Sequence, residues 1–205
     1  METFSGILFL VAFLPYILAI LKLGKVLPNW KICSRIPDVD PPKKGTWLIW
    51  AALDSASLIA MIIGGGFSPQ LVGAVIGAWV VLILTLKYGV PGWSKLEKYC
   101  LALAAVGLVL SLILRRPEFA LAASLSAVFI GGVPTFQDSW SKPQTVDKFS
   151  WTIWWLSCVL ALIAIPNFPH WTFVGSAQQV TFAAIESIVC FNLFIVPLFG
   201  RLFRR

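Results

Sequence analysis

The amino-acid sequence predicts an all-α integral membrane protein with seven transmembrane helices, and two observations support this fold class. Hydrophobic residues make up 59% of the 205 residues and the mean hydropathy is +0.86, whereas charged residues reach only 12%. Apolar residues also form uninterrupted runs of roughly 17 to 25 residues, without the alternation typical of a membrane β-strand. Because lipid offers no partner to backbone N–H and C=O groups, such runs form helices.

Seven apolar runs, separated by charges and turn residues, predict the helices in chain order. They cover residues 6–27, 46–65, 68–88, 97–114, 118–138, 149–166 and 175–199. The first run resembles a signal peptide in length, but Glu2 stands where a signal peptide carries basic residues, and no small-residue cleavage motif follows Ala19. We therefore expect a transmembrane helix there too.

Basic residues in the connecting loops predict the orientation, because they are retained on the cytosolic side during insertion. Fourteen of the 16 lie in alternate loops and at the carboxyl terminus: Lys22, Lys25, Lys31, Arg35, Lys43, Lys44, Lys87, Lys95, Lys98, Lys142, Lys148, Arg201, Arg204 and Arg205. The opposite loops carry only Arg115 and Arg116. We expect a plasma membrane or bacterial inner membrane protein with its amino terminus outside and its carboxyl terminus in the cytosol. Contact with anionic lipid explains the net charge of +7 without a nucleic-acid partner.

No pattern of residues predicts an enzyme, a metal site or a cofactor. Cys33, Cys100, Cys158 and Cys190 lack the spacing of metal or redox sites and are interpreted as small apolar residues. The single histidine, His170, lies in a predicted loop, and no Ser/Lys or paired-Asp arrangement occurs at helical spacing. The last helix also lacks the lysine to which a seven-helix photoreceptor attaches retinal.

The sequence contains an internal repeat. The matching segments are 27–37 with 133–143, 46–50 with 150–154, 58–60 with 162–164, and 68–72 with 176–180. Helices of similar composition match by chance, but these matches keep their order and nearly constant spacing over three helices.

The repeat predicts a 3+1+3 organisation. Residues 1–90 form the first three-helix repeat, 91–116 a linker helix, and 117–205 the second three-helix repeat. The odd helix between them reverses the chain, so the repeats are parallel and related by an axis along the membrane normal.

This organisation resembles that of the SWEET sugar transporters and the wider PQ-loop superfamily, and the resemblance covers essentially the whole chain. Pro134 near the end of the fifth helix, followed by Gln137, Lys142 and Thr145, is similar to the proline-containing helix and basic loop of that family. The stretch 185–188, which follows Gln179 in the seventh helix, resembles the region after the substrate-binding asparagine of SWEETs. The resemblance implies a transporter of a small polar solute such as a sugar.

Five polar residues are predicted to line a midplane cavity between the repeats. Ionisable groups in lipid are costly, so Asp54 and Glu186 are expected to face a polar space. Helical spacing puts Gln179 on the face of Glu186. Gln70 and Gln178 occupy matching places in the two repeats, and amides suit hydroxyl-rich solutes. The alternative is that these side chains bond one another and hold helices together.

Two tryptophans and two prolines are candidates for moving parts. Trp50 and Trp154 begin helices at the predicted cytosolic interface, where they either belong to an aromatic belt or form an inner gate. Pro28 and Pro134 weaken the first helix of each repeat and act as hinges or as static kinks.

Taken together, these patterns predict a membrane transporter in which two repeats rock about a midplane site. Its partners would be the lipid bilayer and a small polar solute. Facilitation and proton coupling both remain open, as does assembly into a homo-oligomer. The alternative function is a non-transporting receptor or scaffold on the same fold, which would bind without moving its ligand.

Overall fold

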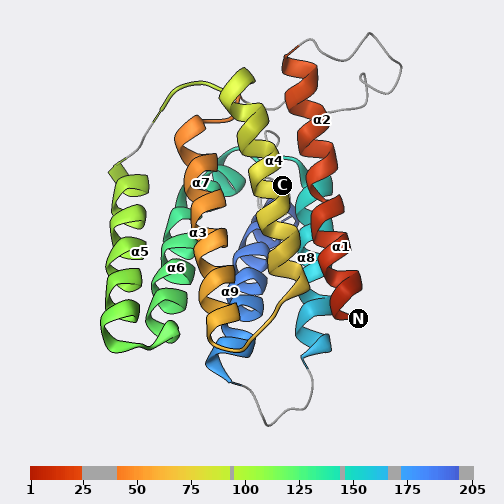
Figure 1. Cartoon of the computed structure of the whole chain (residues 1–205). Helices are drawn as coiled ribbons and strands as arrows, with labels where there is room; N and C mark the ends of the chain where they lie inside the picture. The colour runs from red at the N-terminus through yellow and green to blue at the C-terminus, as the bar shows by residue number, and fades with distance from the viewer. Residues whose placement is uncertain (25–40, 93–94, 144–145, 166–171, 199–205) are drawn as a thin grey trace.

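We describe a computed structural model of the chain over residues 1–24, 41–92, 95–143, 146–165 and 172–198. Helices account for most of these residues, and the described ranges contain no β-strand. In chain order the elements are α1 (Glu2–Val11), α2 (Phe13–Leu23), α3 (Lys44–Ile63), α4 (Pro69–Tyr88), α5 (Lys95–Leu114), α6 (Pro117–Gly131), α7 (Val133–Ser141), α8 (Lys148–Ala164), α9 (Phe173–Cys190) and the π-helical turn η2 (Phe191–Ile195). The prediction of an all-helical chain is confirmed (Figure 1).

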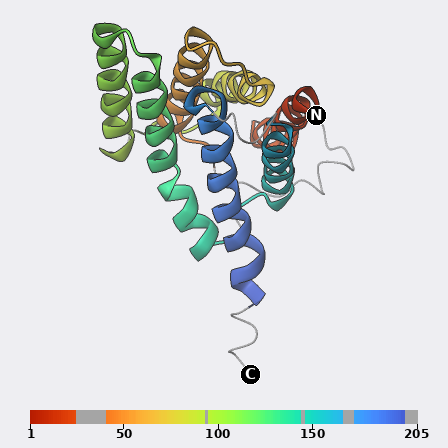
Figure 2. The ribbon, with the colours of Figure 1, turned by 90° about the horizontal axis from the view of Figure 1, so that it is seen from below.

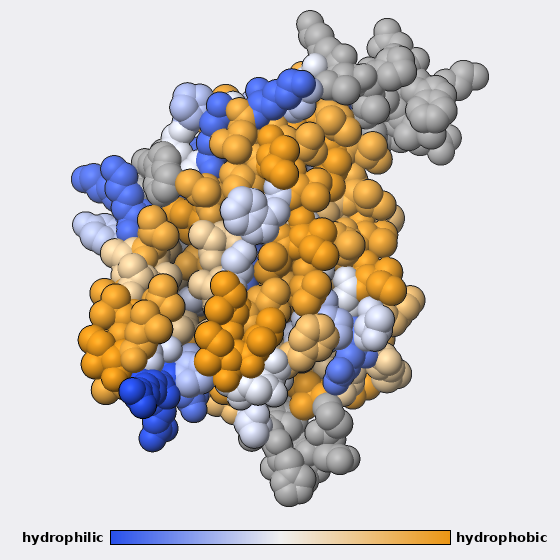
Figure 3. Space-filling view, viewed as in Figure 1, coloured by the Kyte–Doolittle hydropathy of each residue, from blue (hydrophilic) through white to orange (hydrophobic). Residues whose placement is uncertain are grey.

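Within the described ranges, six stretches are long and apolar enough to cross a membrane. They are Glu2–Leu23, Lys44–Ile63, Pro69–Tyr88, Lys95–Leu114, Pro117–Ser141 and Phe173–Leu198. The remaining apolar helix, Lys148–Ala164, has 17 residues, the lower end of the usual range for a transmembrane helix. The face in Figure 3 is mostly hydrophobic, with strongly hydrophilic residues gathered toward its ends. These features confirm a chain suited to a bilayer.

Two of the crossing stretches are interrupted within their length. The helix is broken at Ala12, between α1 and α2, and at Gly132, between α6 and α7. Pro15 and Pro134 follow these breaks, and each lacks the N–H that would continue the helical hydrogen-bond ladder. Pro28, the predicted counterpart of Pro134, lies outside the described residues, so Pro15 is the described proline that matches Pro134.

Hydrogen-bonding side chains fix the starts of α4 and α9. Ser68 accepts a bond from Leu71 N at 3.2 Å, with Pro69 in the first turn of α4. Thr172 accepts from Gly175 N at 3.1 Å at the start of α9. These caps satisfy backbone donors that a helix would otherwise leave unpaired at its end.

The helices pack in a closed order. α4 packs against both α1 and α3, and α9 packs against both α6 and α8. Contacts between α3 and α6, and between α1 and α8, join these two groups. Figure 2 shows α5 at the edge of the bundle beside α6. Only Cys100, Ala104 and Gly107 of α5 are buried, so most of its surface faces outward.

Candidate functional site

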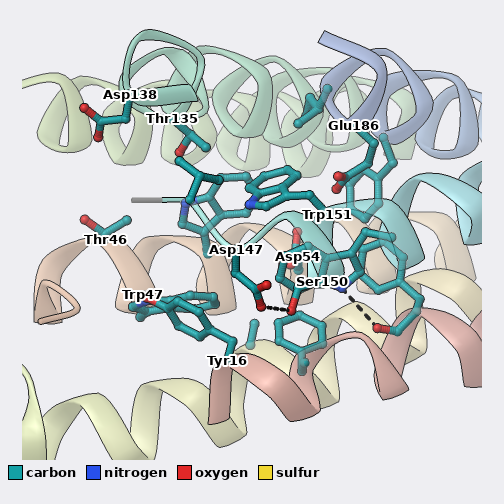
Figure 4. A pocket seen from close by; sticks show the side chains of 18 residues that line it. Tyr16, Thr46, Trp47, Asp54, Thr135, Asp138, Asp147, Ser150, Trp151 and Glu186 are labelled. Carbon is teal, nitrogen blue, oxygen red and sulfur yellow. Dashed lines mark hydrogen bonds between the residues drawn. The ribbon is translucent and has the colours of Figure 1, made fainter. Parts of the chain in front are cut away.

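A cavity of about 270 Å³ lies where the two groups of helices meet. Its wall is formed by side chains from α1, α2, α3, α4, α7, α8 and α9, together with the segment that leads into α8. Figure 4 shows how these side chains converge on a common space. A space of this size suits one small solute.

Two carboxyl groups reach the cavity from helices that are distant in sequence. Asp54 lies midway along α3 and Glu186 lies in the second half of α9, and their exposed fractions are 3% and 6%. Both line the cavity (Figure 4). Oδ1 of Asp54 and Oε2 of Glu186 are buried without a hydrogen-bond partner in the described part of the chain. The structure therefore brings together the two ionisable residues that the sequence singled out.

Four tryptophans form much of the wall. Trp47 and Trp50 share a face of α3 with Asp54, as helical spacing predicts, and all three line the cavity. Trp151 and Trp154 line it from α8, and their rings meet edge to face at 5.2 Å. These indoles thus border an interior space.

Hydrogen bonds and ring contacts hold this aromatic wall in place. Nε1 of Trp154 donates to the carbonyl oxygen of Phe9 at 3.1 Å, which ties α8 to α1. The ring of Phe13 meets Trp154 edge to face at 4.9 Å, and Tyr16 lies 5.3 Å from Trp47. Since the N–H of Trp154 is already bonded, its ring surface is what it offers to a ligand.

One end of the cavity is lined by polar residues from the helix ends. Thr46, Thr135, Asp138 and Asp147 lie there, next to the starts of α3 and α8 and in α7. Both carboxylate oxygens of Asp147 accept hydrogen bonds from nearby residues: Oδ1 from Phe149 N at 3.1 Å and Oδ2 from Ser150 Oγ at 2.6 Å. We call this end the mouth.

The mouth lies at the basic end of the bundle. Lys43 and Lys44 stand at the start of α3, and Lys148 begins α8. Lys142 follows α7, directly beyond the helix that carries Asp138. The cavity therefore opens toward the loops in which the sequence concentrates its positive charge.

A cluster of hydrogen-bonded polar residues lies one helical turn beyond the other end of the cavity. We call it the polar seam, and it consists of Ser5, Ser68, Gln70, Ser157 and Gln178. Nε2 of Gln178 donates to Oε1 of Gln70 at 3.2 Å, and Ser68 Oγ donates to Oε1 of Gln178 at 2.7 Å. Ser5 and Ser157 exchange bonds between their hydroxyls and backbone carbonyls at 2.9 and 2.8 Å. The seam joins α1 and α4 to α8 and α9.

The predicted glutamines thus do not all face the cavity. Gln70 and Gln178 bond each other in the polar seam, an arrangement that agrees with the helix-packing alternative. Gln179 is 8% exposed and is not among the described lining residues. Its Oε1 has no partner in the described ranges. A role for any of the three in binding a solute stays a prediction.

The sequence interpretation missed the aromatic residues contributed by the first helix. Phe9, Phe13 and Tyr16 all line the cavity, and Phe182 joins them from α9. The spacing of the first three at intervals of four and three residues is the signal that could have found them, because it puts them on one helix face. Phe182 lies one turn before Glu186 on the predicted polar face of its helix.

The described residues contain no group of three His, Cys, Asp or Glu side chains that could hold a metal ion. No protein-family model, curated protein or solved structure matches the chain. The resemblance to SWEET and PQ-loop transporters stays a prediction.

Proposed function

We propose that this protein is a transporter that moves a small polar solute across a plasma membrane or bacterial inner membrane by alternating access. The observation that carries the proposal is the cavity between two groups of helices, with a mouth at one end and the polar seam at the other. A binding site enclosed between two bodies becomes accessible from either side when they rock about it. Because the sequence resembles SWEETs, a sugar is the first solute to consider.

The moving bodies would be the predicted repeats, residues 1–90 and 117–205, with the linker helix 91–116 between them. In support, the third helix of each set packs between the other two: α4 between α1 and α3, and α9 between α6 and α8. The breaks at Ala12 and Gly132 fall in the first helix of each set. Two sets of helices that pack in the same order can form an inward-open conformation and a related outward-open conformation.

The described conformation would be open to the cytosol. This assignment follows from the proposed orientation, with the amino terminus outside and the carboxyl terminus inside, because the mouth lies at the end rich in lysines. In the other conformation the polar seam would part and the mouth would narrow. Trp50 and Trp154 are our candidates for the inner gate, and Pro15 and Pro134 are candidates for hinges.

Cysteine accessibility tests the proposal without knowledge of the solute. Ile185 lines the cavity beside Glu186, so a single Ile185→Cys change in a chain lacking its four native cysteines reports access to the site. The chain is reconstituted in right-side-out and inside-out vesicles and treated with a membrane-impermeant maleimide. We expect labelling from both sides, faster from the lysine-rich side.

Three control positions define the sides and the reagent. Arg116→Cys and Lys43→Cys lie in loops at opposite ends of the bundle and should each react from one side only. Ile83 is 63% exposed on the outer surface of α4, so a cysteine introduced by Ile83→Cys should face lipid and react from neither side. If Ile185→Cys reacts from the lysine-rich side alone, the protein is a one-sided receptor or scaffold and not a transporter.

A further inference from the structure

The cavity combines acidic and aromatic groups, and this combination identifies the class of its solute. Asp54 and Glu186 lie in its wall, Asp138 lies at its mouth, and no Lys, Arg or His is among the described residues that line it. The other lining carboxylate, Asp147, already accepts two bonds from its own helix start. The described wall therefore combines acidic side chains with no basic lining side chain to pair with them.

The two deep carboxyl groups are each more than nine-tenths buried and have an oxygen without a protein partner. A carboxylate removed from water costs free energy unless a cation or hydrogen-bond donors offset the loss. Elsewhere the chain supplies such donors from within: Asp147 receives them from Phe149 and Ser150, and Gln178 receives one from Ser68. At Asp54 and Glu186 the unpaired oxygens leave this role to the solute.

The rest of the wall suits a cation and offers few donors to a neutral polyol. Aromatic rings attract cations to their faces through the quadrupole of the π system, and tryptophan does so most strongly. Trp47, Trp50, Trp151 and Trp154 all contribute rings to this wall. The amides that would serve a sugar do not, because Gln70 and Gln178 bond each other in the polar seam. Thr46 is also engaged, since its hydroxyl donates to Glu97.

We infer that the solute is a small organic cation, an ammonium or guanidinium compound, held between Asp54 and Glu186 and against the tryptophan rings. That the cation is transported rests on the proposed function. That it binds rests only on the residues that line the cavity. A sugar, by contrast, would stack on the same rings and leave the two carboxylates without a countercharge.

Direct binding tests the charge requirement. The purified full chain in detergent micelles is titrated with tetramethylammonium, choline and methylguanidinium, while tryptophan fluorescence is followed. Two neutral probes run beside them: 3,3-dimethyl-1-butanol, which has the shape of choline without its charge, and glucose. We expect saturable binding of at least one cation and none of the neutral probes.

Isosteric variants then locate the site. Glu186→Gln and Asp54→Asn each remove a charge with little change of shape, and either should weaken cation binding by about tenfold or more. Glu118→Gln is the matched control, because Oε2 of Glu118 is also buried without a partner but the residue does not line the cavity. The Glu118→Gln variant should bind the cation with the same affinity as the unmodified chain.

Three results would overturn the inference. They are equal binding of choline and its neutral analogue, binding of glucose with no binding of any cation, and cation binding that survives both Glu186→Gln and Asp54→Asn. Failure here is distinct from failure of the transport proposal. Two-sided labelling of Ile185→Cys without cation binding leaves a transporter of another solute, whereas cation binding with one-sided labelling leaves a receptor for cations.

Discussion

At the scale of single residues, position within the bundle separates side chains that look alike in the sequence. Gln178 and Gln179 are adjacent, yet Gln178 is fully buried with bonds to Gln70 and Ser68, and Gln179 has an Oε1 without a partner in the described ranges. Adjacent residues on a helix point about 100° apart, so only one of them can face a given neighbour.

We therefore expect different results from the same substitution at these two positions. Gln178→Leu removes two bonds, so the Ser68 hydroxyl loses its acceptor and Gln70 Oε1 loses its donor. The free energy of unfolding should therefore fall by about 1–3 kcal/mol. Gln179→Leu, the matched control, should cost clearly less because it breaks no bond described here. Equilibrium unfolding in detergent measures both values, and an equal loss would contradict the polar seam.

Residue identity alone predicted part of the site. Asp54 and Glu186 were recognisable because carboxyl groups in apolar helices seek a polar space. Gln70 and Gln178 were predicted beside them, but in the structure they bond each other in the polar seam and are not among the described residues that line the cavity. Whether a polar side chain lines the cavity or bonds a side chain of another helix depends on the distance between the helices. That distance cannot be read from the sequence of one helix.

At the scale of helices, small residues set how closely neighbours approach. Gly6 of α1 and Gly73 of α4 lie at the crossing of these helices. A Cβ on Gly73 would stand 2.5 Å from the carbonyl oxygen of Gly6, and one on Gly6 would overlap the backbone of Pro69. Backbone atoms cannot yield as a flexible side chain can, so this crossing requires glycine.

Gly73→Leu should therefore separate α1 from α4 and lower the free energy of unfolding by about 3 kcal/mol. Gly131→Ala is a suitable control, because its Cβ would meet only Cys100 Sγ at 3.8 Å, an ordinary contact. Thermal unfolding of the two purified variants measures the difference. A Gly73→Leu protein as stable as the Gly131→Ala protein would rule out a tight crossing at this point.

The expected spans match the observed helices closely, and their ends differ by a few residues. Residues 97–114 were predicted where α5 runs over Lys95–Leu114, and 118–138 where α6 and α7 together cover Pro117–Ser141. The break at Gly132 lies two residues before Pro134, where the sequence predicted a weakened helix. The prediction for Pro28 lies outside the described residues, and the break at Ala12 lies three residues before Pro15. A proline marks a lost hydrogen bond, but its neighbours decide whether the helix breaks there.

At the scale of the whole molecule, the distribution of charge and the direction of the cavity agree. The mouth lies among Lys43, Lys44 and Lys148, and Arg115 and Arg116 lie at the far end of α5. An odd number of crossings is needed to keep fourteen of the 16 basic residues on one side.

Epitope tags at the two ends of the chain test this topology. In intact cells, external protease should remove an amino-terminal tag and spare a carboxyl-terminal tag until the membrane is permeabilised. An even number of crossings would expose both tags or protect both, and would contradict the proposed orientation. The same cells expressing the chain with a tag inserted between Arg115 and Arg116 confirm that protease reaches the outer loops.

Composition and hydropathy alone predict that this chain is helical and suited to a bilayer, where its helices run, and which carboxyl groups are buried. Those properties follow from the solvent, because lipid forces each apolar run to satisfy its own backbone and penalises every charge. Helix packing brings particular residues together: Gln70 bonds Gln178, Trp154 bonds the carbonyl of Phe9, and Asp54 and Glu186 line the same cavity. These contacts join helices that are far apart in the sequence; Ser5 and Ser157, for example, are 152 residues apart. Which helix surfaces meet is determined only when the whole bundle assembles.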